Sequence, residues 1–138
     1  MKSPLTVFTD GGARGNPGPA AIGFVIKNSS GKILCQQGIA VGKTTNNVAE
    51  YLAVIEALKW LAKKTDLVFS QINFFLDSKL VVSQLNGLFK IKETKMRDLI
   101  IKVRQFEREL GGNVSYHLIP RQKNKLADSL VNQTLNKK

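Results

Sequence analysis

Cysteine is almost absent from this sequence: Cys35 is the only one among 138 residues. An internal disulfide is therefore impossible, and a lone thiol is typical of a protein from a reducing compartment. Because Cys35 directly follows Ile33 and Leu34 in a strand-like segment, we expect a small buried side chain at this position and not a catalytic thiol.

Long apolar runs are also missing. No segment approaches the length needed to span a bilayer, and no secretory signal pattern precedes the first predicted strand. We therefore expect a cytoplasmic protein with no membrane partner. Repeats, linkers and low-complexity tracts are absent as well, and 43% of the residues are hydrophobic. These features predict a single domain over residues 1–138 with a substantial core, and we expect a monomer.

Negative charge is scarce. The chain has 10 Asp and Glu against 21 Lys and Arg, which gives a formal net charge of +11. Such an excess of positive charge predicts a polyanionic partner, nucleic acid above all. Charge alone leaves open the alternative of a basic surface that only keeps the protein in solution.

Hydrophobic periodicity predicts alternating strands and helices. Tight turns join the first three predicted strands, which should be antiparallel, whereas helices separate the later strands, which should be parallel. The predicted fold class is therefore α/β, with a mixed sheet flanked by helices. The strands are expected at residues 5–10, 20–27, 32–41, 71–76 and 113–119, and the helices from the cap-type residues 44–47 to about 64, then at 78–86, 93–110 and 124–135.

Four acids stand where predicted elements meet, and each has a local explanation. Asp10 could belong to a turn, and Glu50 follows Asn47 by three residues, as in a relaxed capping box. Asp77 could cap the helix that begins after it, and Asp128 could be a solvated acid beside an apolar stripe.

Taken together, the four acids predict one shared site. Asp10 and Asp77 are both expected to end strands at the carboxyl edge of the sheet, where open α/β sheets bind ligands. Glu50 is expected in the first turn of a helix over that edge, and Asp128 early in the final helix. Four close carboxylates would repel one another unless cations neutralised them. Hard oxygen ligands without Cys or His favour two Mg²⁺ (or Mn²⁺) ions over zinc.

Four stretches of the sequence resemble ribonuclease HI, the type 1 ribonuclease H family. They are residues 9–20, 45–51, 77–82 and 124–128, they occur in the family's order, and the match covers nearly the whole chain. The chain looks most like the compact prokaryotic form, which lacks an extra basic protrusion. The resemblance implies a mixed five-stranded sheet, three antiparallel strands followed by two parallel ones, flanked by helices.

The resemblance also implies a chemistry. A ribonuclease H cleaves the RNA strand of an RNA–DNA hybrid endonucleolytically and leaves 3′-hydroxyl and 5′-phosphate ends. Asp10 would bridge two Mg²⁺ or Mn²⁺ ions, with Glu50 and Asp77 on one side and Asp128 on the other. The four carboxylates would thus be both catalytic residues and metal ligands in a two-metal-ion mechanism.

Substrate contacts are expected from the loop after the first strand and from the start of the first helix. The first strand should stop at Gly11-Gly12, whose missing side chains would let the backbone approach a minor groove. Short amides can pair with 2′-hydroxyls and base edges, although turn and helix capping is an equally good explanation of each one alone. These amides are those of Asn16, Asn46 and Asn47. The resemblance adds Thr45, at a position that binds a DNA-strand phosphate, and Ser78, near the scissile strand.

Basic residues suggest further contacts. A belt over residues 90–108 could track a nucleic-acid backbone, such as that of the DNA strand, or could be a solvated helix face. For Lys102, Arg104 and Arg108 we favour the solvated face. The belt consists of Lys90, Lys92, Lys95, Arg97, Lys102, Arg104 and Arg108. Within it, Lys90 is a candidate substrate contact, as is Asn124 in the fourth matching stretch.

One departure from the family pattern concerns histidine. Many members carry a histidine in the loop between the last strand and the last helix, and this chain has none there. Its only histidine, His117, falls inside the last predicted strand and is expected to be an ordinary strand residue. Our hypothesis is that Arg121 or Lys123 partly substitutes by contacting the scissile phosphate.

Two other functions compete with this interpretation. The first is a catalytically weak nucleic-acid-binding module of the same fold, against which the presence of all four acids speaks. The second is another nuclease of the same superfold, such as a transposase or resolvase core. The glycine loop and the pair Asn46-Asn47 disfavour it, because an enzyme that acts only on DNA has no 2′-hydroxyl to recognise.

Overall fold

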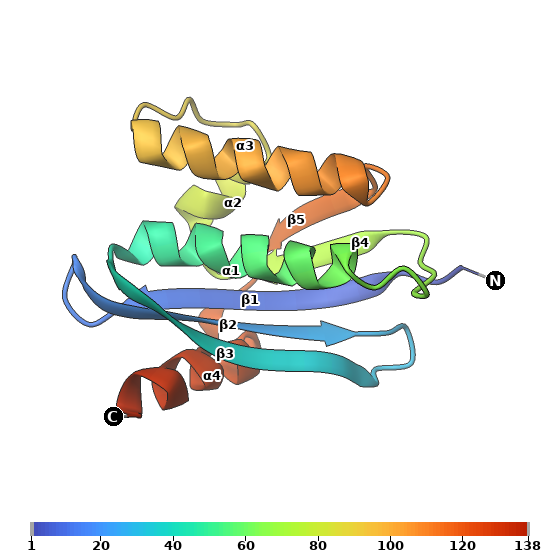
Figure 1. The fold of residues 1–138 in the computed structure, drawn as a ribbon, viewed down its shortest axis with the longest axis horizontal. Helices are drawn as coiled ribbons and strands as arrows, with labels where there is room; N and C mark the ends of the chain where they lie inside the picture. Colours follow the sequence, from blue (N-terminus) through green and yellow to red (C-terminus); the bar gives the residue numbers. More distant parts are fainter. Residues whose placement is uncertain (1, 138) are drawn as a thin grey trace.

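The computed structural model describes residues 2–137, which form a mixed sheet with helices on both faces (Figure 1). The strand order is β3-β2-β1-β4-β5. β1 pairs antiparallel with β2, β2 pairs antiparallel with β3, and the β1–β4 and β4–β5 pairs are parallel, so the predicted fold class is confirmed. The elements are β1 (Leu5–Ala13), β2 (Gly18–Lys27), β3 (Ile33–Thr44), α1 (Asn46–Ala62), β4 (Ile72–Leu76), α2 (Lys79–Leu85), α3 (Thr94–Glu109), β5 (Val114–Leu118), the 3₁₀ turn η1 (Arg121–Lys123) and α4 (Lys125–Asn136).

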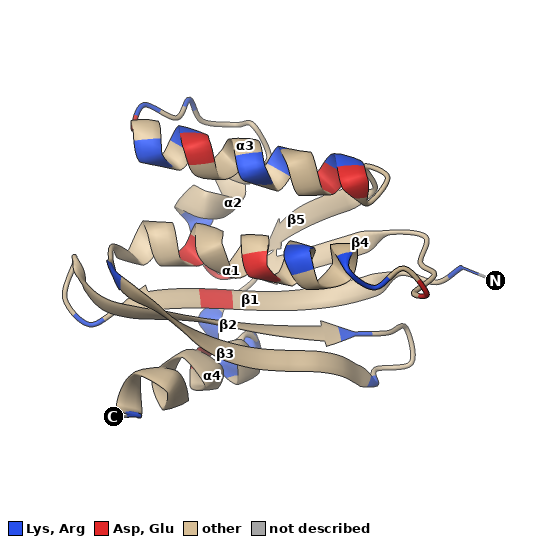
Figure 2. Ribbon diagram, in the orientation of Figure 1, with Lys and Arg blue, Asp and Glu red and all other residues tan. Residues whose placement is uncertain are grey.

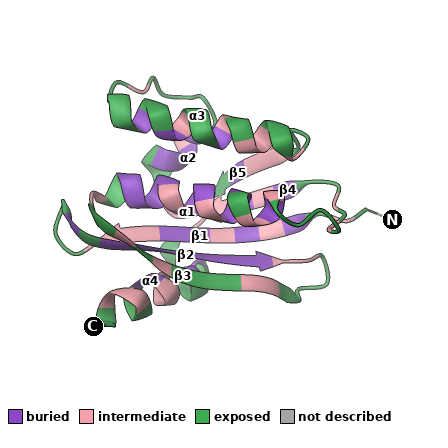
Figure 3. Cartoon of the chain, viewed as in Figure 1, coloured by how far each residue is buried: buried purple, intermediate pink, exposed green. Residues whose placement is uncertain are grey.

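The hydrophobic core lies between α1 and the sheet. Figure 3 shows buried residues along β1, β2 and α1, whereas much of α3, which packs outside α1, is exposed. Tyr51 and Leu58 of α1 and Phe24 of β2 are among the largest buried side chains. α4 covers the opposite face, mainly over β2 and β3. Among residues 2–137, no helix is both long and apolar enough to cross a bilayer.

β1 is longer than the sequence pattern predicts. The expected end at Gly11-Gly12 is wrong, because β1 runs to Ala13 and pairs with Ala20 of β2 at its far end. Only the parallel pairing with β4 stops early, at Phe8 and Phe75. Beyond that point β2 still pairs with Gly11 and Gly12, so these two glycines continue β1. Asp10 therefore lies inside β1 and not at its end.

α4 approaches β2 closely because Gly23 leaves room for it. A Cβ at Gly23 would lie 2.5 Å from the carbonyl oxygen of Ala127 and 2.9 Å from the Cβ of Leu130. Gly23 is also the cross-strand partner of Asp10. The close contact therefore brings the first turn of α4, which carries Asp128, beside Asp10 at the sheet.

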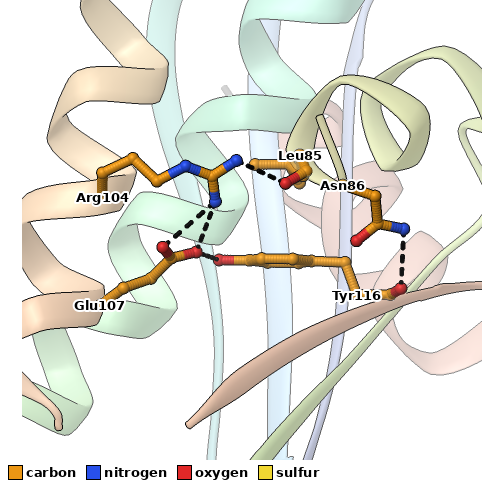
Figure 4. A network of polar contacts seen from close by, with 5 residues as sticks. All are labelled: Leu85, Asn86, Arg104, Glu107 and Tyr116. Carbon is orange, nitrogen blue, oxygen red and sulfur yellow. Dashed lines mark hydrogen bonds and ion pairs between the residues drawn. The ribbon is translucent and has the colours of Figure 1, made fainter. Parts of the chain in front are cut away.

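A polar network ties α3 to β5 and to the end of α2 (Figure 4). The Tyr116 hydroxyl donates to Glu107 Oε2 at 2.6 Å, and Arg104 Nη1 donates to the same carboxylate at 2.9 Å. Arg104 Nη2 also donates to the carbonyl oxygen of Leu85, and Asn86 Nδ2 donates to that of Tyr116. The expectation of a solvated Arg104 needs correction, because this side chain bridges two helices.

Replacing Glu107 with alanine should remove the shared acceptor of this network. The Tyr116 hydroxyl, which is buried, and the Arg104 guanidinium would both lose a charged partner, so we expect a loss of about 2–3 kcal/mol in unfolding free energy. Urea denaturation measures it. Glu109→Ala is the matched control on an exposed position of the same helix and should change stability by less than about 0.5 kcal/mol. Equal, small effects of both variants would contradict a stabilising network.

Candidate metal centre

Three carboxylates converge at one edge of the sheet. Asp10, Glu50 and Asp77 offer oxygen atoms that all lie within 4.8 Å of one another. The parallel register of β1 and β4 pairs Phe8 with Phe75, and continuing it by two residues aligns Asp10 with Asp77. Figure 2 marks acidic positions on β1 and on the neighbouring helix α1. The sequence analysis expects four acids at this edge, and the structure brings these three within 4.8 Å of one another.

Glu50 reaches the site from the second turn of α1, not from the first as expected. α1 begins at Asn46 with Thr45 as its N-cap, and the Thr45 hydroxyl accepts a hydrogen bond from the backbone N–H of Val48. The capping box suggested for Glu50 therefore does not form. Instead, the backbone N–H of Gly11 donates to Glu50 Oε1 at 2.7 Å. Glu50 Oε2 is buried without a hydrogen-bond partner among the described residues, which leaves one oxygen available for a cation.

Asp77 is held by a buried amide. Ser78, and not Asp77, caps α2, by accepting from the backbone N–H of Val81. Asn124 Nδ2 donates to Asp77 Oδ2 at 3.0 Å and to the carbonyl oxygen of Thr9 at 2.8 Å. Asn124 is only 1% exposed. The expectation that it contacts substrate is therefore wrong, because its side chain is enclosed and positions Asp77.

Asp128 completes the acidic lining beside Asp10, outside the group of three whose oxygens all lie within 4.8 Å of one another. It lies in the first turn of α4, and its Oδ2 is 3.4 Å from Asn132 Nδ2. It lines the same cavity, of about 460 Å³, as the other three acids. The sequence did not single out Arg14, Asn132 or Leu135, which also line this cavity. Asn132 and Leu135 lie four and seven residues after Asp128 on α4. This helical spacing could have indicated them, because positions i+4 and i+7 share a face with position i.

The electrostatics of the site favour a cation. Burial, together with the charges of Asp77 and Asp128, raises the pKa of Asp10 from 3.8 to about 7. Burial and the neighbouring charge of Asp10 raise the pKa of Glu50 well above its ordinary value. Close, partly desolvated carboxylates with one unpartnered oxygen fit a divalent cation that prefers oxygen ligands. Asp10, Glu50 and Asp77 could hold such an ion, with Asp128 at the margin of the site.

The raised pKa values predict a pH dependence of the metal-free protein. Between about pH 4 and pH 7 the folded state holds more protons than the unfolded chain. The contribution of these two acids to the unfolding free energy is therefore present near pH 4 and is lost as the pH rises through about 7. In chelator, the melting temperature of the parent should fall across this window relative to that of Asp10→Asn. Asp98→Asn, at an exposed acid on α3, should follow the parent. Parallel curves for the parent and Asp10→Asn would contradict the charge clustering.

Two asparagines connect the end of β1 and the loop that follows it to α1. Asn16 Oδ1 accepts from the backbone N–H of Asn46 at 2.9 Å, and Asn46 Oδ1 accepts from the backbone N–H of Ala13 at 2.8 Å. The capping alternative for these amides is therefore realised in the structure. Asn46 and Asn47 nevertheless line the acidic cavity, as do Gly11, Gly12 and Ser78.

The basic candidates are separated by the structure. Arg121 lines the acidic cavity, whereas Lys123 lines a smaller hollow beside Phe8. Lys90 lines a third cavity, of about 190 Å³, which it shares with Asn47. His117 lies on β5 as expected. Of the two residues proposed to substitute for the loop histidine, only Arg121 is near the carboxylates.

A mixed sheet with this strand order and with acids on β1, α1, α4 and at the end of β4 defines a ribonuclease H-like protein. A family model described as reverse transcriptase-like matches residues 8–134. The chain is 38% identical over 130 residues to Ribonuclease HI of Halobacterium salinarum, which covers 93% of this chain. It superposes on the crystal structure of LC11-RNase H1 in complex with an RNA/DNA hybrid with a TM-score of 0.89, at 42% identity and 94% coverage of each chain. The chain belongs to the ribonuclease HI family, which confirms the resemblance found in its motifs.

The curated relatives differ in length. The chain spans 62% of the Halobacterium protein and 35% of the bifunctional protein Rv2228c of Mycobacterium tuberculosis, to which it is 35% identical over 132 residues. The matched region of each relative is thus a part of a longer protein.

Proposed function

We propose that this chain is an endoribonuclease that cleaves the RNA strand of RNA–DNA hybrids. The observation that carries the proposal is the convergence of the carboxylates of Asp10, Glu50 and Asp77 in a chain of net charge +11. A strongly basic protein that concentrates acids in one cavity is suited to bind cations and a polyanion together. The similar LC11-RNase H1 has been crystallised with an RNA/DNA hybrid, which supports this choice of substrate.

The four carboxylates would hold two Mg²⁺ or Mn²⁺ ions. When bound, such a pair supplies an activated water nucleophile and stabilises the departing 3′ oxygen, which gives 3′-hydroxyl and 5′-phosphate products. This chain's own residues fix the geometry. The Gly11 N–H orients Glu50, and the Asn124 amide orients Asp77. Both contacts are made by buried or part-buried groups, so the carboxylates are preorganised before substrate arrives.

Recognition of the RNA strand is proposed for the rim of the cavity. Asn47 is exposed in the first turn of α1 and borders both the acidic cavity and the one that Lys90 lines. We expect its amide to pair with 2′-hydroxyls and base edges of a substrate bound between the two cavities. Gly11 and Gly12 line the acidic cavity without side chains of their own, so we expect the backbone there to lie against the minor groove of the hybrid.

Cleavage of a labelled RNA–DNA hybrid, beside double-stranded RNA and DNA of the same sequence, tests the proposal. We expect cleavage of the RNA strand of the hybrid alone, with Mg²⁺ or Mn²⁺ and not in chelator. A ligase should be able to rejoin the products, and removal of the 5′-phosphate should prevent the rejoining. Hybrid binding without cleavage in either metal would contradict the proposal and favour the catalytically weak binding module of the same fold. Equal cleavage of double-stranded DNA would favour another nuclease of the superfold.

Arg121 is expected to contact the scissile phosphate in place of the missing loop histidine. Because a charged hydrogen bond contributes about 1.5–3 kcal/mol, Arg121→Ala should lower kcat/KM on the hybrid by about tenfold or more. Lys123→Ala is the matched control on the same turn, outside the acidic cavity, and should stay within about threefold of the parent on a blunt hybrid. Turnover of Arg121→Ala equal to that of the parent would remove this role.

A further inference from the structure

A row of aromatic rings crosses the part of the sheet that α4 leaves open. α4 packs mainly on β2, with further contacts to β3 and β1. Beyond it, the rings of Phe8 on β1 and Phe75 on β4 stack with centroids 5.5 Å apart, and Phe75 and His117 on β5 stack at 5.1 Å. We call Phe8, Phe75 and His117 the aromatic row. Phe8 and Phe75 are half-buried, and His117 is exposed.

One end of the row is covered and the other is open. Lys27 Nζ lies 5.4 Å from the ring centroid of Phe8, so a lysine covers that end. Phe75 lies between the other two rings. His117 lies on β5, which is an edge strand, and no further strand adjoins it in the described sheet. The outer side of the His117 ring is therefore available to one more flat, aromatic group.

The row adjoins the acidic site. Side chains two residues apart on a strand share a face, so Phe8 lies on the same face as Asp10, about 7 Å along β1. Phe75 likewise precedes Asp77 by two residues. The turn η1 connects the two regions, because Arg121 lines the acidic cavity and Lys123 lines a hollow of about 70 Å³ next to Phe8.

The surroundings of the row are basic and polar. Lys27 and Lys123 both line the hollow beside Phe8, and its described lining contains no Asp or Glu. On β5, the Ser115 hydroxyl donates to Asn73 Oδ1 at 2.7 Å and lies 2.9 Å from His117 Nε2, which fixes the imidazole. Stacked rings flanked by lysines fit nucleobases and phosphates better than the apolar side chains of a protein partner.

We propose that the aromatic row binds a single-stranded nucleic-acid segment that continues, unpaired, from the hybrid in the acidic cavity. A base stacks on the open side of His117, and Lys27 and Lys123 contact the phosphates of the segment. This inference rests on the proposed function for the position of the hybrid, but the row would bind the segment whether or not the hybrid is cleaved.

Fluorescence anisotropy with Asp10→Asn protein, which should bind hybrid without cutting it, tests the inference. The probes are a blunt hybrid and the same hybrid with a ten-nucleotide dT tail on either end of either strand. We expect one tail position to strengthen binding, and His117→Ala to weaken binding of that probe by about tenfold while leaving blunt-hybrid affinity within twofold. His117→Phe should restore the affinity, because phenylalanine also stacks. Leu118→Ala, at the neighbouring exposed position on the other face of β5, should have no effect.

Several outcomes would overturn the inference. A tail that adds no affinity at any position would do so, as would equal weakening of blunt and tailed hybrids by His117→Ala. If sedimentation showed that the parent is a dimer and that His117→Ala is a monomer, the aromatic row would instead be a contact with a second copy of the chain. Failure of the proposed function is distinguishable, because a parent that binds tailed hybrid more tightly but never cleaves it leaves the stacking result intact.

Discussion

Asp10→Asn is expected to reduce cleavage of an RNA–DNA hybrid by about a thousandfold or more. Asp10 belongs to the group of three with Glu50 and Asp77, and its carboxylate also interacts with that of Asp128, so we expect no other acid to replace it. The amide carries no charge and offers one oxygen instead of two, and metal-ion stabilisation of the transition state contributes several kcal/mol. Single-turnover rates with saturating Mg²⁺ measure the effect.

Binding and folding should survive this substitution. Removing a negative charge from a cavity that faces phosphates should leave hybrid affinity equal to or higher than that of the parent. In chelator near pH 7, the variant should melt no lower than the parent, because burial and like charges destabilise the ionised Asp10. Asp98→Asn is the control and should retain full activity. Activity of Asp10→Asn within tenfold of the parent would exclude a catalytic role for Asp10, and a joint loss of binding and stability would indicate misfolding instead.

Gly11→Ala should be among the most destabilising single substitutions in the chain. A Cβ at this position would overlap the carbonyl group of Ala49 and lie 2.6 Å from the backbone nitrogen of Glu50. These are backbone atoms of a packed helix, which cannot move aside as a flexible side chain could. We expect a loss of about 3 kcal/mol or more in unfolding free energy, at the upper end of overpacking costs. Thermal and urea denaturation measure it.

The same substitution should also impair activity, because Gly11 N–H orients Glu50. Gly12→Ala is the matched control, one residue along β1. Its Cβ would lie 3.7 Å from Val131 Cγ1, an ordinary contact, so stability should change by less than about 1 kcal/mol. If the two variants were equally stable, the close approach of α1 to β1 would not be a constraint on the fold.

Much of the fold is encoded locally. Alternating apolar residues and tight turns predict the first three strands, and helical periodicity predicts α1, α3 and α4, which the structure contains within a few residues of the expected bounds. The ends of β1 and β3 are the main exceptions, because each strand runs three residues beyond its expected end. Gly11 and Gly12 are typical of a turn, but β2 supplies a pairing partner as far as Ala13, and tertiary pairing outweighs a weak local preference.

The site follows a similar division. The sequence singled out all four acids, because their expected positions near strand ends and helix starts and their likeness to the family's motifs can be read from the order of residues. It did not indicate that Asn124 is buried against Asp77, or that Lys123 lines the hollow beside Phe8 and not the acidic cavity. These properties depend on how η1 and α4 pack across the sheet, and no local pattern in residues 120–128 reports that packing.

The sequence by itself determined the class of fold, the basic character of the surface and the identity of the acids. Only the tertiary structure decided how those acids are held. The Gly11–Glu50 hydrogen bond joins residues 39 apart in the chain, and the Asn124–Thr9 hydrogen bond joins residues 115 apart. Periodicity reports only the local structure of neighbouring residues. A buried polar contact between distant segments, in contrast, exists only after the core has brought those segments together.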